Sequence, residues 1–140
     1  ITGFPGETEE EFQVTYDFLK DLPVSYLHAF TYSERPNTTA MRISENVVSK
    51  EERYNRTKML RILSHKKKKA FYQSQIGTER EILVEADESG GMLNGFSENY
   101  VKVKLPFDEA LINTIQPVVL KEIYRDGVVK VEMLNQPVDA

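Results

Sequence analysis

The sequence predicts an α+β protein in which part of an α/β layer and a long linker helix precede a small five-stranded antiparallel β-barrel. Three observations predict this fold. A glycine-rich turn follows the first residues, an unbroken helical pattern covers the middle of the chain, and five short strand patterns follow within about 60 residues. We therefore expect two domains, one of residues 1–75 and one of residues 76–136.

The composition is that of a soluble globular chain. Of the 140 residues, 40% are hydrophobic and 29% are charged, and no apolar run approaches the roughly 20 residues that cross a membrane. The chain has no cysteine, which excludes disulfides, thiolate metal sites and a cysteine nucleophile. Its two histidines are far apart in the sequence and form no metal-ligand pattern. We expect no membrane contact and no metal site.

The first residues have the pattern of a strand end that runs into a tight turn. Ile1-Thr2 precedes a glycine- and proline-rich segment at residues 3–7, and Thr8 with Glu11 forms the capping box of a helix that Pro23 ends. The turn is either a plain strand–helix joint or a strand-end loop of a parallel layer, where such folds bind ligands. Because a chain rarely begins at the end of a strand, we expect a longer protein from which this piece comes.

The segment 24–31 is apolar and aromatic with little alternation, which predicts a buried parallel strand. A polar loop follows at residues 32–40, and its Arg35 either binds an anion, pairs with Glu34 or faces water. Without further strands beside it, the segment would expose apolar surface. We therefore expect this half of the chain to self-associate.

A long helix is predicted from about Lys50 to Gln75, begun by a capping box of Ser49 and Glu52. Residues 50–80 carry a net charge of +7, between an acidic first part and an acidic last part. Four successive lysines lie in this helix and point all round it, because they span a little more than one turn: Lys66, Lys67, Lys68 and Lys69. They form either a solvated segment or a phosphate-binding surface.

Short strand patterns fill the last part of the chain, and their number predicts a small closed barrel of the oligonucleotide-binding general type. Pro117 suggests a sheet edge or a bulge, and Asp126-Gly127 suggests a hairpin turn. Residues from Gln136 onward should be loose. The predicted strands are residues 80–86, 92–96, 100–105, 114–124 and 128–134, with a short helical turn at residues 106–113.

The segment 100–105 alternates strictly between apolar and other residues. A strand with this pattern directs alternate apolar side chains into the core and the intervening side chains into solvent. The solvent-facing set is Tyr100, Lys102 and Lys104. An exposed ring and two cations are the groups that stack on a base and neutralise phosphate. The same pattern also fits an ordinary half-buried strand with lysines outside.

Several segments resemble one family, the radical S-adenosylmethionine methylthiotransferases. Residues 1–8, Ile-Thr-Gly-Phe-Pro-Gly-Glu-Thr, resemble a late strand-end loop of these enzymes, and residues 32–38 resemble the next strand-end motif, with Asn37 in place of the usual glycine. Residues 77–134, with Gly91-Met92-Leu93 and Glu98-Asn99-Tyr100-Val101, resemble their TRAM domain. Residues 69–72 resemble the branch that modifies threonylcarbamoyladenosine beside the tRNA anticodon.

The resemblance implies that the intact protein is a cytoplasmic transferase that methylthiolates adenosine in tRNA with 4Fe-4S clusters and S-adenosylmethionine. The family's cluster-binding cysteines, including a CxxxCxxC motif, are missing from this sequence. The expected consequence is that these 140 residues hold no catalytic residue, no metal and no bound cofactor of their own, are inactive alone, and need missing N-terminal domains. Contacts with S-adenosylmethionine are implied for Ile1, Gly3 and Glu7.

The resemblance also implies that the anticodon stem-loop of tRNA is the partner of the barrel and of the basic residues. The implied RNA contacts are Asn99, Tyr100, Lys102, Lys104, Lys66, Lys67, Lys68, Lys69 and Arg35. A second interpretation is a non-catalytic barrel that docks onto a protein or another RNA. It is supported by the net charge of −6 over residues 81–140, which repels RNA at long range.

Overall fold

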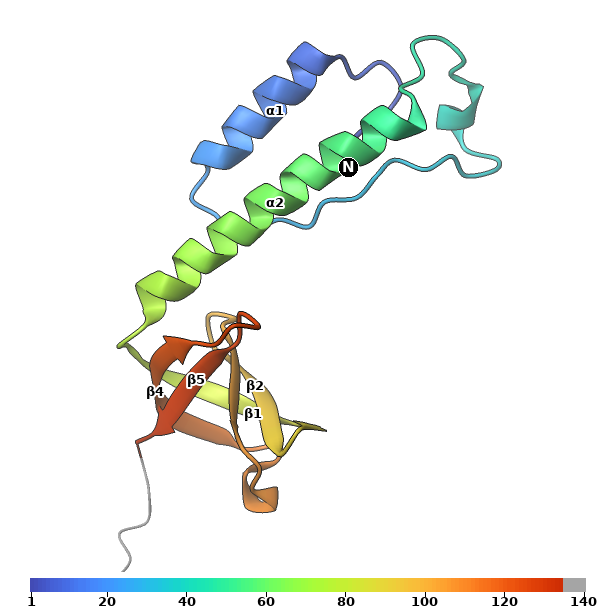
Figure 1. Ribbon diagram of the computed structural model, residues 1–140. Helices are drawn as coiled ribbons and strands as arrows, with labels where there is room; N and C mark the ends of the chain where they lie inside the picture. The colour runs from blue at the N-terminus through green and yellow to red at the C-terminus, as the bar shows by residue number, and fades with distance from the viewer. Residues whose placement is uncertain (135–140) are drawn as a thin grey trace, which may run out of the picture. The chain divides into compact units, whose positions relative to one another are not determined.

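The structure is a computed structural model, and it describes residues 1–134 (Figure 1). The chain forms two compact units, one of residues 1–68 and one that begins at Lys69. The long helix α2 (Lys50–Gln75) has the bounds that the sequence predicts, and its last residues belong to the second unit. The tail from Gln136, expected to be loose, lies outside the described residues.

The first unit is built on two helices. In α1 (Glu9–Asp21), the Thr8 hydroxyl accepts from the Glu11 N–H while the Glu11 carboxylate accepts from the Thr8 N–H, so the predicted capping box is present. The Ser49 hydroxyl likewise accepts from the Glu52 N–H at the start of α2. A short 3-10 turn, η1 (Thr39–Arg42), precedes α2. The two helices share a small core whose buried members are Phe12, Leu60 and Leu63.

Residues 24–31 are not the buried strand that the sequence predicts, and none of them is fully buried. Extended backbone pairs at one point, where Thr31 forms a parallel bridge with Thr2. Farther back, the Ser64 hydroxyl bonds both the N–H and the carbonyl of Leu27, each at 2.8 Å. Ser64 of α2 thus supplies hydrogen bonds that a neighbouring strand would otherwise provide to Leu27. The apolar composition indicated burial, but composition does not say what covers the segment.

The second unit is a closed barrel in the order β1-β2-β3-β5-β4. All pairs are antiparallel except β3 with β5, which run parallel with Val103 beside Val129, so the prediction of a wholly antiparallel barrel is wrong in this pair. A two-residue period indicates a strand but carries no information on its direction of pairing. The strands are β1 (Glu79–Ser89), β2 (Met92–Ser97), β3 (Lys102–Pro106), β4 (Ile115–Ile123) and β5 (Val129–Met133), with a 3-10 turn η2 (Glu109–Leu111) before β4.

Pro117 marks neither an edge nor the bulge that the sequence suggests. It lies inside β4 opposite Glu81 of β1, and a closed barrel leaves no free edge for it to occupy. The irregularity in the pairing of β4 with β5 falls later, between Leu120 and Glu122. The Pro117 carbonyl still accepts from the Leu134 N–H at 3.0 Å, so the residue contributes to closure as an acceptor.

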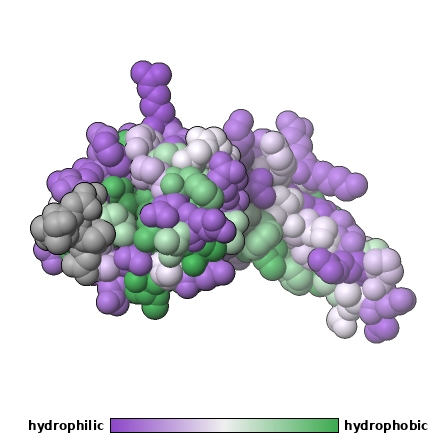
Figure 2. Space-filling model, turned by 90° about the horizontal axis from the view of Figure 1, so that it is seen from below, coloured by the Kyte–Doolittle hydropathy of each residue, from purple (hydrophilic) through white to green (hydrophobic). Residues whose placement is uncertain are grey.

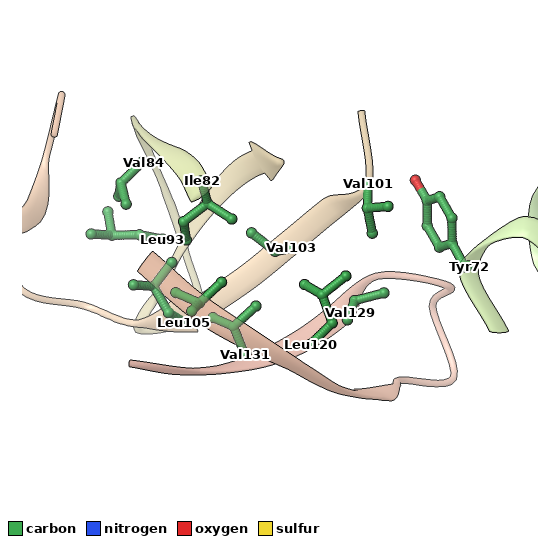
Figure 3. Close-up of a cluster of buried hydrophobic side chains, with 11 residues drawn as sticks. Tyr72, Ile82, Val84, Leu93, Val101, Val103, Leu105, Leu120, Val129 and Val131 are labelled. Carbon is green, nitrogen blue, oxygen red and sulfur yellow. The ribbon is translucent and has the colours of Figure 1, made fainter. Parts of the chain in front are cut away.

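The barrel core is filled by alternate side chains of all five strands (Figure 3). Tyr72 of α2 joins this core with 3% of its surface exposed, and its ring lies beside Val101 in Figure 3. Its hydroxyl accepts from the backbone N–H of Lys102 at 3.0 Å. The other buried members of this core are Ile82, Val84, Leu93, Val101, Val103, Leu105, Val118, Leu120, Val129 and Val131. The last turns of α2 therefore fold as part of the barrel unit.

Candidate nucleic-acid interface

Tyr100 lies in the turn before β3 and not in the strand, as the alternation had suggested. Its φ of 71° is left-handed, and its N–H donates to the Ser97 carbonyl at 2.9 Å. The side chain is nevertheless 62% exposed, as expected for a contact residue. Its ring lies against that of Phe96, with centroids 4.9 Å apart and planes inclined by 32°. Phe96 is not among the site residues predicted from the sequence, although its place two residues after Asn94 in an alternating strand marks it as outward-facing.

Lys102 lies directly opposite Phe96 in the pairing of β2 with β3. Since Val101 and Val103 point into the core, the side chain of Lys102 projects outward, as predicted. Phe96, Tyr100 and Lys102 together form what we call the aromatic–lysine patch. The patch offers a ring face and a cation on one wall of the barrel. Figure 2 shows one face of the molecule, where hydrophobic side chains reach the surface among hydrophilic ones.

Lys104 also points outward but is engaged within the chain. Its Nζ donates to the Asp126 carboxylate at 2.8 Å and lies 4.3 Å from the centre of the Tyr124 ring. The hydrogen bond from Lys104 holds the pKa of Asp126 below its usual value. Lys104 is therefore held at the β4–β5 hairpin, and it would have to leave Asp126 to bind a phosphate.

Asn99 uses both polar atoms of its side chain inside the barrel unit. Its Oδ1 accepts from the Ser97 hydroxyl at 2.6 Å, and its Nδ2 donates to the Gln75 Oε1 at 2.9 Å. An asparagine in a turn pattern carries no signal for such long-range pairing. The contact of Asn99 with RNA that the resemblance implies stays a prediction.

The four lysines of α2 have different surroundings. Lys67 Nζ donates to the carbonyls of Lys20 and Leu22, at 2.9 and 2.8 Å, and so binds the carboxyl end of α1. Lys68 Nζ lies 6.0 Å from the centre of the Tyr26 ring. Lys66 and Lys69 are exposed.

Arg35 and Ile1 border the same hollow of about 460 Å³ in the first unit, which Thr31, Ser33 and Thr38 also line. Gly3 and Glu7 instead bond to each other, the Gly3 N–H donating to Glu7 Oε1 at 2.9 Å. The other partner of that oxygen is Arg56, whose Nη1 lies 2.8 Å away.

The residues of this chain do not fit an iron–sulfur cluster, because the sequence offers no thiolate. Within residues 1–134, no group of three or more histidine, aspartate and glutamate side chains is placed to hold a metal ion, and no helix is long and apolar enough to cross a membrane. For S-adenosylmethionine, Ile1 borders an open hollow, whereas the Gly3 N–H and the Glu7 carboxylate already have partners within the chain. Contacts of these three residues with the cofactor stay a prediction.

Arg53 organises the loop that carries Arg35. It is 3% exposed, its Nε donates to the Val48 carbonyl at 2.8 Å, and its Nη2 lies 2.6 Å from the Glu34 carboxylate. The hydrogen bond from Arg53 lowers the pKa of Glu34 to about 2. Glu34 is thus paired with Arg53 of α2 and not with its neighbour Arg35, which was one of the alternatives.

No protein-family model matches the chain, but curated proteins do. It is 40% identical over 104 residues to a threonylcarbamoyladenosine tRNA methylthiotransferase MtaB of Aquifex aeolicus, covering 74% of this chain and 24% of that protein. It is 34% identical over 128 residues to a tRNA-2-methylthio-N(6)-dimethylallyladenosine synthase of Geobacter sulfurreducens, covering 91% of this chain and 28% of that protein.

A third relative is named for a different substrate. The chain is 39% identical over 100 residues to a ribosomal protein uS12 methylthiotransferase RimO of Heliobacterium modesticaldum, covering 70% of this chain and 21% of that protein. These names share one chemistry, and the resemblance found in the sequence is confirmed. The chain therefore belongs to the methylthiotransferase family, and it spans about a quarter of the length of the curated relatives that it matches.

Proposed function

We propose that this chain is the RNA-binding part of a tRNA methylthiotransferase that acts on threonylcarbamoyladenosine beside the anticodon. The observation that carries the proposal is the aromatic–lysine patch, in which two rings in contact and a cation lie together on the outside of the barrel. Stacking on an aromatic ring and neutralisation of phosphate are the two means by which small barrels bind unpaired RNA. Relatives from Aquifex aeolicus and Bacillus subtilis that are named for threonylcarbamoyladenosine support this choice of base.

Catalysis would depend on residues outside this chain. The family's iron–sulfur clusters and S-adenosylmethionine supply the radical and sulfur chemistry, and they require thiolates that this sequence lacks. The 140 residues of this chain would bind the RNA and orient it. We therefore expect no methylthiotransferase activity from the 140 residues alone.

One observation favours a second candidate, a barrel that docks onto a protein. Leu83 lies opposite both Phe96 and Ile115 in the strand register, and it is 50% exposed while Ile115 is 66% exposed. The acidic side chains of Glu81 and Glu85 flank Leu83 along β1. An apolar row with carboxylates beside it is better suited to a basic protein segment than to RNA.

A titration of the 140-residue chain with a labelled anticodon stem-loop RNA at two salt concentrations tests the proposal. Affinity should fall as salt rises, and Tyr100→Ala should cost roughly 1–3 kcal/mol of binding free energy because one stacking contact is lost. Lys121→Ala is the matched control, since Lys121 pairs with Glu132 and lies on β4, which neighbours neither β2 nor β3.

The lysines of β3 provide the decisive variant. If Lys102→Ala combined with Lys104→Ala leaves RNA affinity unchanged, this surface does not bind RNA. The apolar row around Leu83 then becomes the surface to test, by Leu83→Ser with a protein partner.

A further inference from the structure

The turn that presents Tyr100 is closed by Ser97. The Ser97 carbonyl accepts from the Tyr100 N–H at 2.9 Å, and the Ser97 N–H donates to the Val101 carbonyl at 3.0 Å. The Ser97 hydroxyl accepts from the Val101 N–H at 2.8 Å, and this serine is only 4% exposed. The backbone on both sides of Tyr100 is therefore fixed by one buried residue, through its backbone and its hydroxyl together.

The Asn99 amide connects this turn to the end of α2. The Ser97 hydroxyl uses its hydrogen on Asn99 Oδ1, while Asn99 Nδ2 donates to Gln75 Oε1. Gln75 Oε1 also accepts from Arg80 Nη2 at 2.8 Å, so the acceptor is itself held in place. An RNA contact by Asn99 would break bonds that the fold already uses, and their loss costs free energy.

Tyr100 needs such support because a tyrosine at a φ of 71° is in a sparsely populated conformation. The surroundings have to hold it there. As a result of that conformation, the Tyr100 ring lies against the ring of Phe96, which is paired with Lys102.

We infer that Asn99 is a positioning residue, which fixes the Ser97–Val101 turn against Gln75 and thereby holds the Tyr100 ring in place to stack on an unpaired base. The identity of the ligand rests on the proposed function, whereas the positioning of the ring does not. Asn99 makes no contact with the RNA in this scheme. Its effect on binding passes through Tyr100.

The first experiment measures the position of the ring in the free chain. Because the sequence contains no tryptophan, Tyr100→Trp introduces a single tryptophan, whose fluorescence can be excited without exciting the remaining tyrosines. Adding Asn99→Ala should lower the fluorescence anisotropy of that reporter, since the ring gains freedom. The control is Asn94→Ala, which removes another bonded asparagine of the barrel that does not touch the turn. Unchanged anisotropy with Asn99→Ala would overturn the inference.

The second experiment is a double-mutant cycle with the anticodon stem-loop RNA. Tyr100→Ala should weaken binding about tenfold or more, and Asn99→Ala about three- to tenfold, in keeping with the loss or misplacement of one stacked base. The double variant should bind no more weakly than Tyr100→Ala alone. Additive losses would mean that Asn99 contacts the RNA itself, and the inference would be wrong.

Two further measurements separate the possible failures. Gln75→Met removes the acceptor at the other end of the bridge and should reproduce the effect of Asn99→Ala, while circular dichroism checks that each variant is folded. If the unsubstituted chain fails to bind the stem-loop, the proposed function is wrong. The anisotropy of the free chain still decides whether Asn99 positions the ring.

Discussion

Gly3 lies directly against the aliphatic part of the Arg53 side chain, with no room for a methyl group between them. Gly3 also has a φ of 81°, which residues with a Cβ rarely adopt. Gly3→Ala should therefore lower the free energy of unfolding by about 2–4 kcal/mol, from the strained backbone and the displaced arginine together. Urea unfolding followed by far-ultraviolet circular dichroism measures the loss.

Gly6→Ala is the matched control for that variant. Gly6 has a similar φ of 93°, but a Cβ there would meet no neighbour within 4 Å. Gly6→Ala should therefore lower the free energy of unfolding only by the backbone strain, about 1–2 kcal/mol. Equal losses in the two variants would show that displacing the Arg53 side chain costs no free energy of unfolding.

The ion pair of Glu34 with Arg53 makes the first unit sensitive to acid. The pKa of Glu34 is about 2 in the folded chain, below its usual value of 4.5, chiefly because Arg53 donates a hydrogen bond to it. A depressed pKa stabilises the fold fully above pH 4.5, and this contribution is lost as the pH falls towards 2. Glu34→Gln should therefore be less stable than the unsubstituted chain at neutral pH, and the difference should vanish towards pH 2.

Glu45→Gln, which changes an exposed carboxylate of the same unit, is the comparison for the acid titration. Thermal unfolding at a series of pH values gives both curves. A stability difference for Glu34→Gln that stayed constant down to pH 2 would contradict the assigned pairing.

Lys67 should matter more for folding than for RNA. Its ammonium group binds two carbonyls at the carboxyl end of α1, where a cation is favoured. Lys67→Met should lower the free energy of unfolding by about 1 kcal/mol. Lys66→Met, at an exposed neighbour, should leave stability unchanged and is the better test of phosphate binding. Equal stability of the two variants would rule out the capping role.

The Tyr72 hydroxyl should stabilise the barrel through the backbone of Lys102. Tyr72→Phe removes the acceptor of that N–H and should cost about 1–2 kcal/mol, because a half-buried donor loses its partner. Tyr124→Phe removes the hydroxyl of a tyrosine at the hairpin and provides the control. Hydrogen exchange of the Lys102 amide gives a direct readout, which should speed up in Tyr72→Phe and stay unchanged in the control.

Local signals in the sequence predicted the helices and strands well. The capping pattern at Thr8 and Glu11, the hydroxyl cap at Ser49 and the unbroken pattern of α2 indicated the helices, while the period of two indicated the outward direction of Lys102 and Lys104. These features depend on neighbours within a few residues. A single sequence therefore contains the information that specifies them.

Features that depend on distant partners were not predictable in the same way. Nothing near Val103 or Val129 in the sequence indicates that their strands run parallel, and nothing near Asn99 names Gln75 as its partner. Residues 24–31 show the limit most clearly, since their apolar composition indicated a buried strand while Ser64 of α2 supplies the hydrogen bonds. The pairing partner is a property of the whole fold.

The place of β5, the last strand in the sequence, between β3 and β4 has a consequence for synthesis in the cell. Because β5 lies between β3 and β4 in the closed order, its absence would leave two open strand edges. The barrel consequently cannot close on a nascent chain until Met133 has left the ribosome. Until then, the unpaired edges of β3 and β4 are open to pairing with other chains. A premature stop before Val129 would therefore yield a product prone to aggregate.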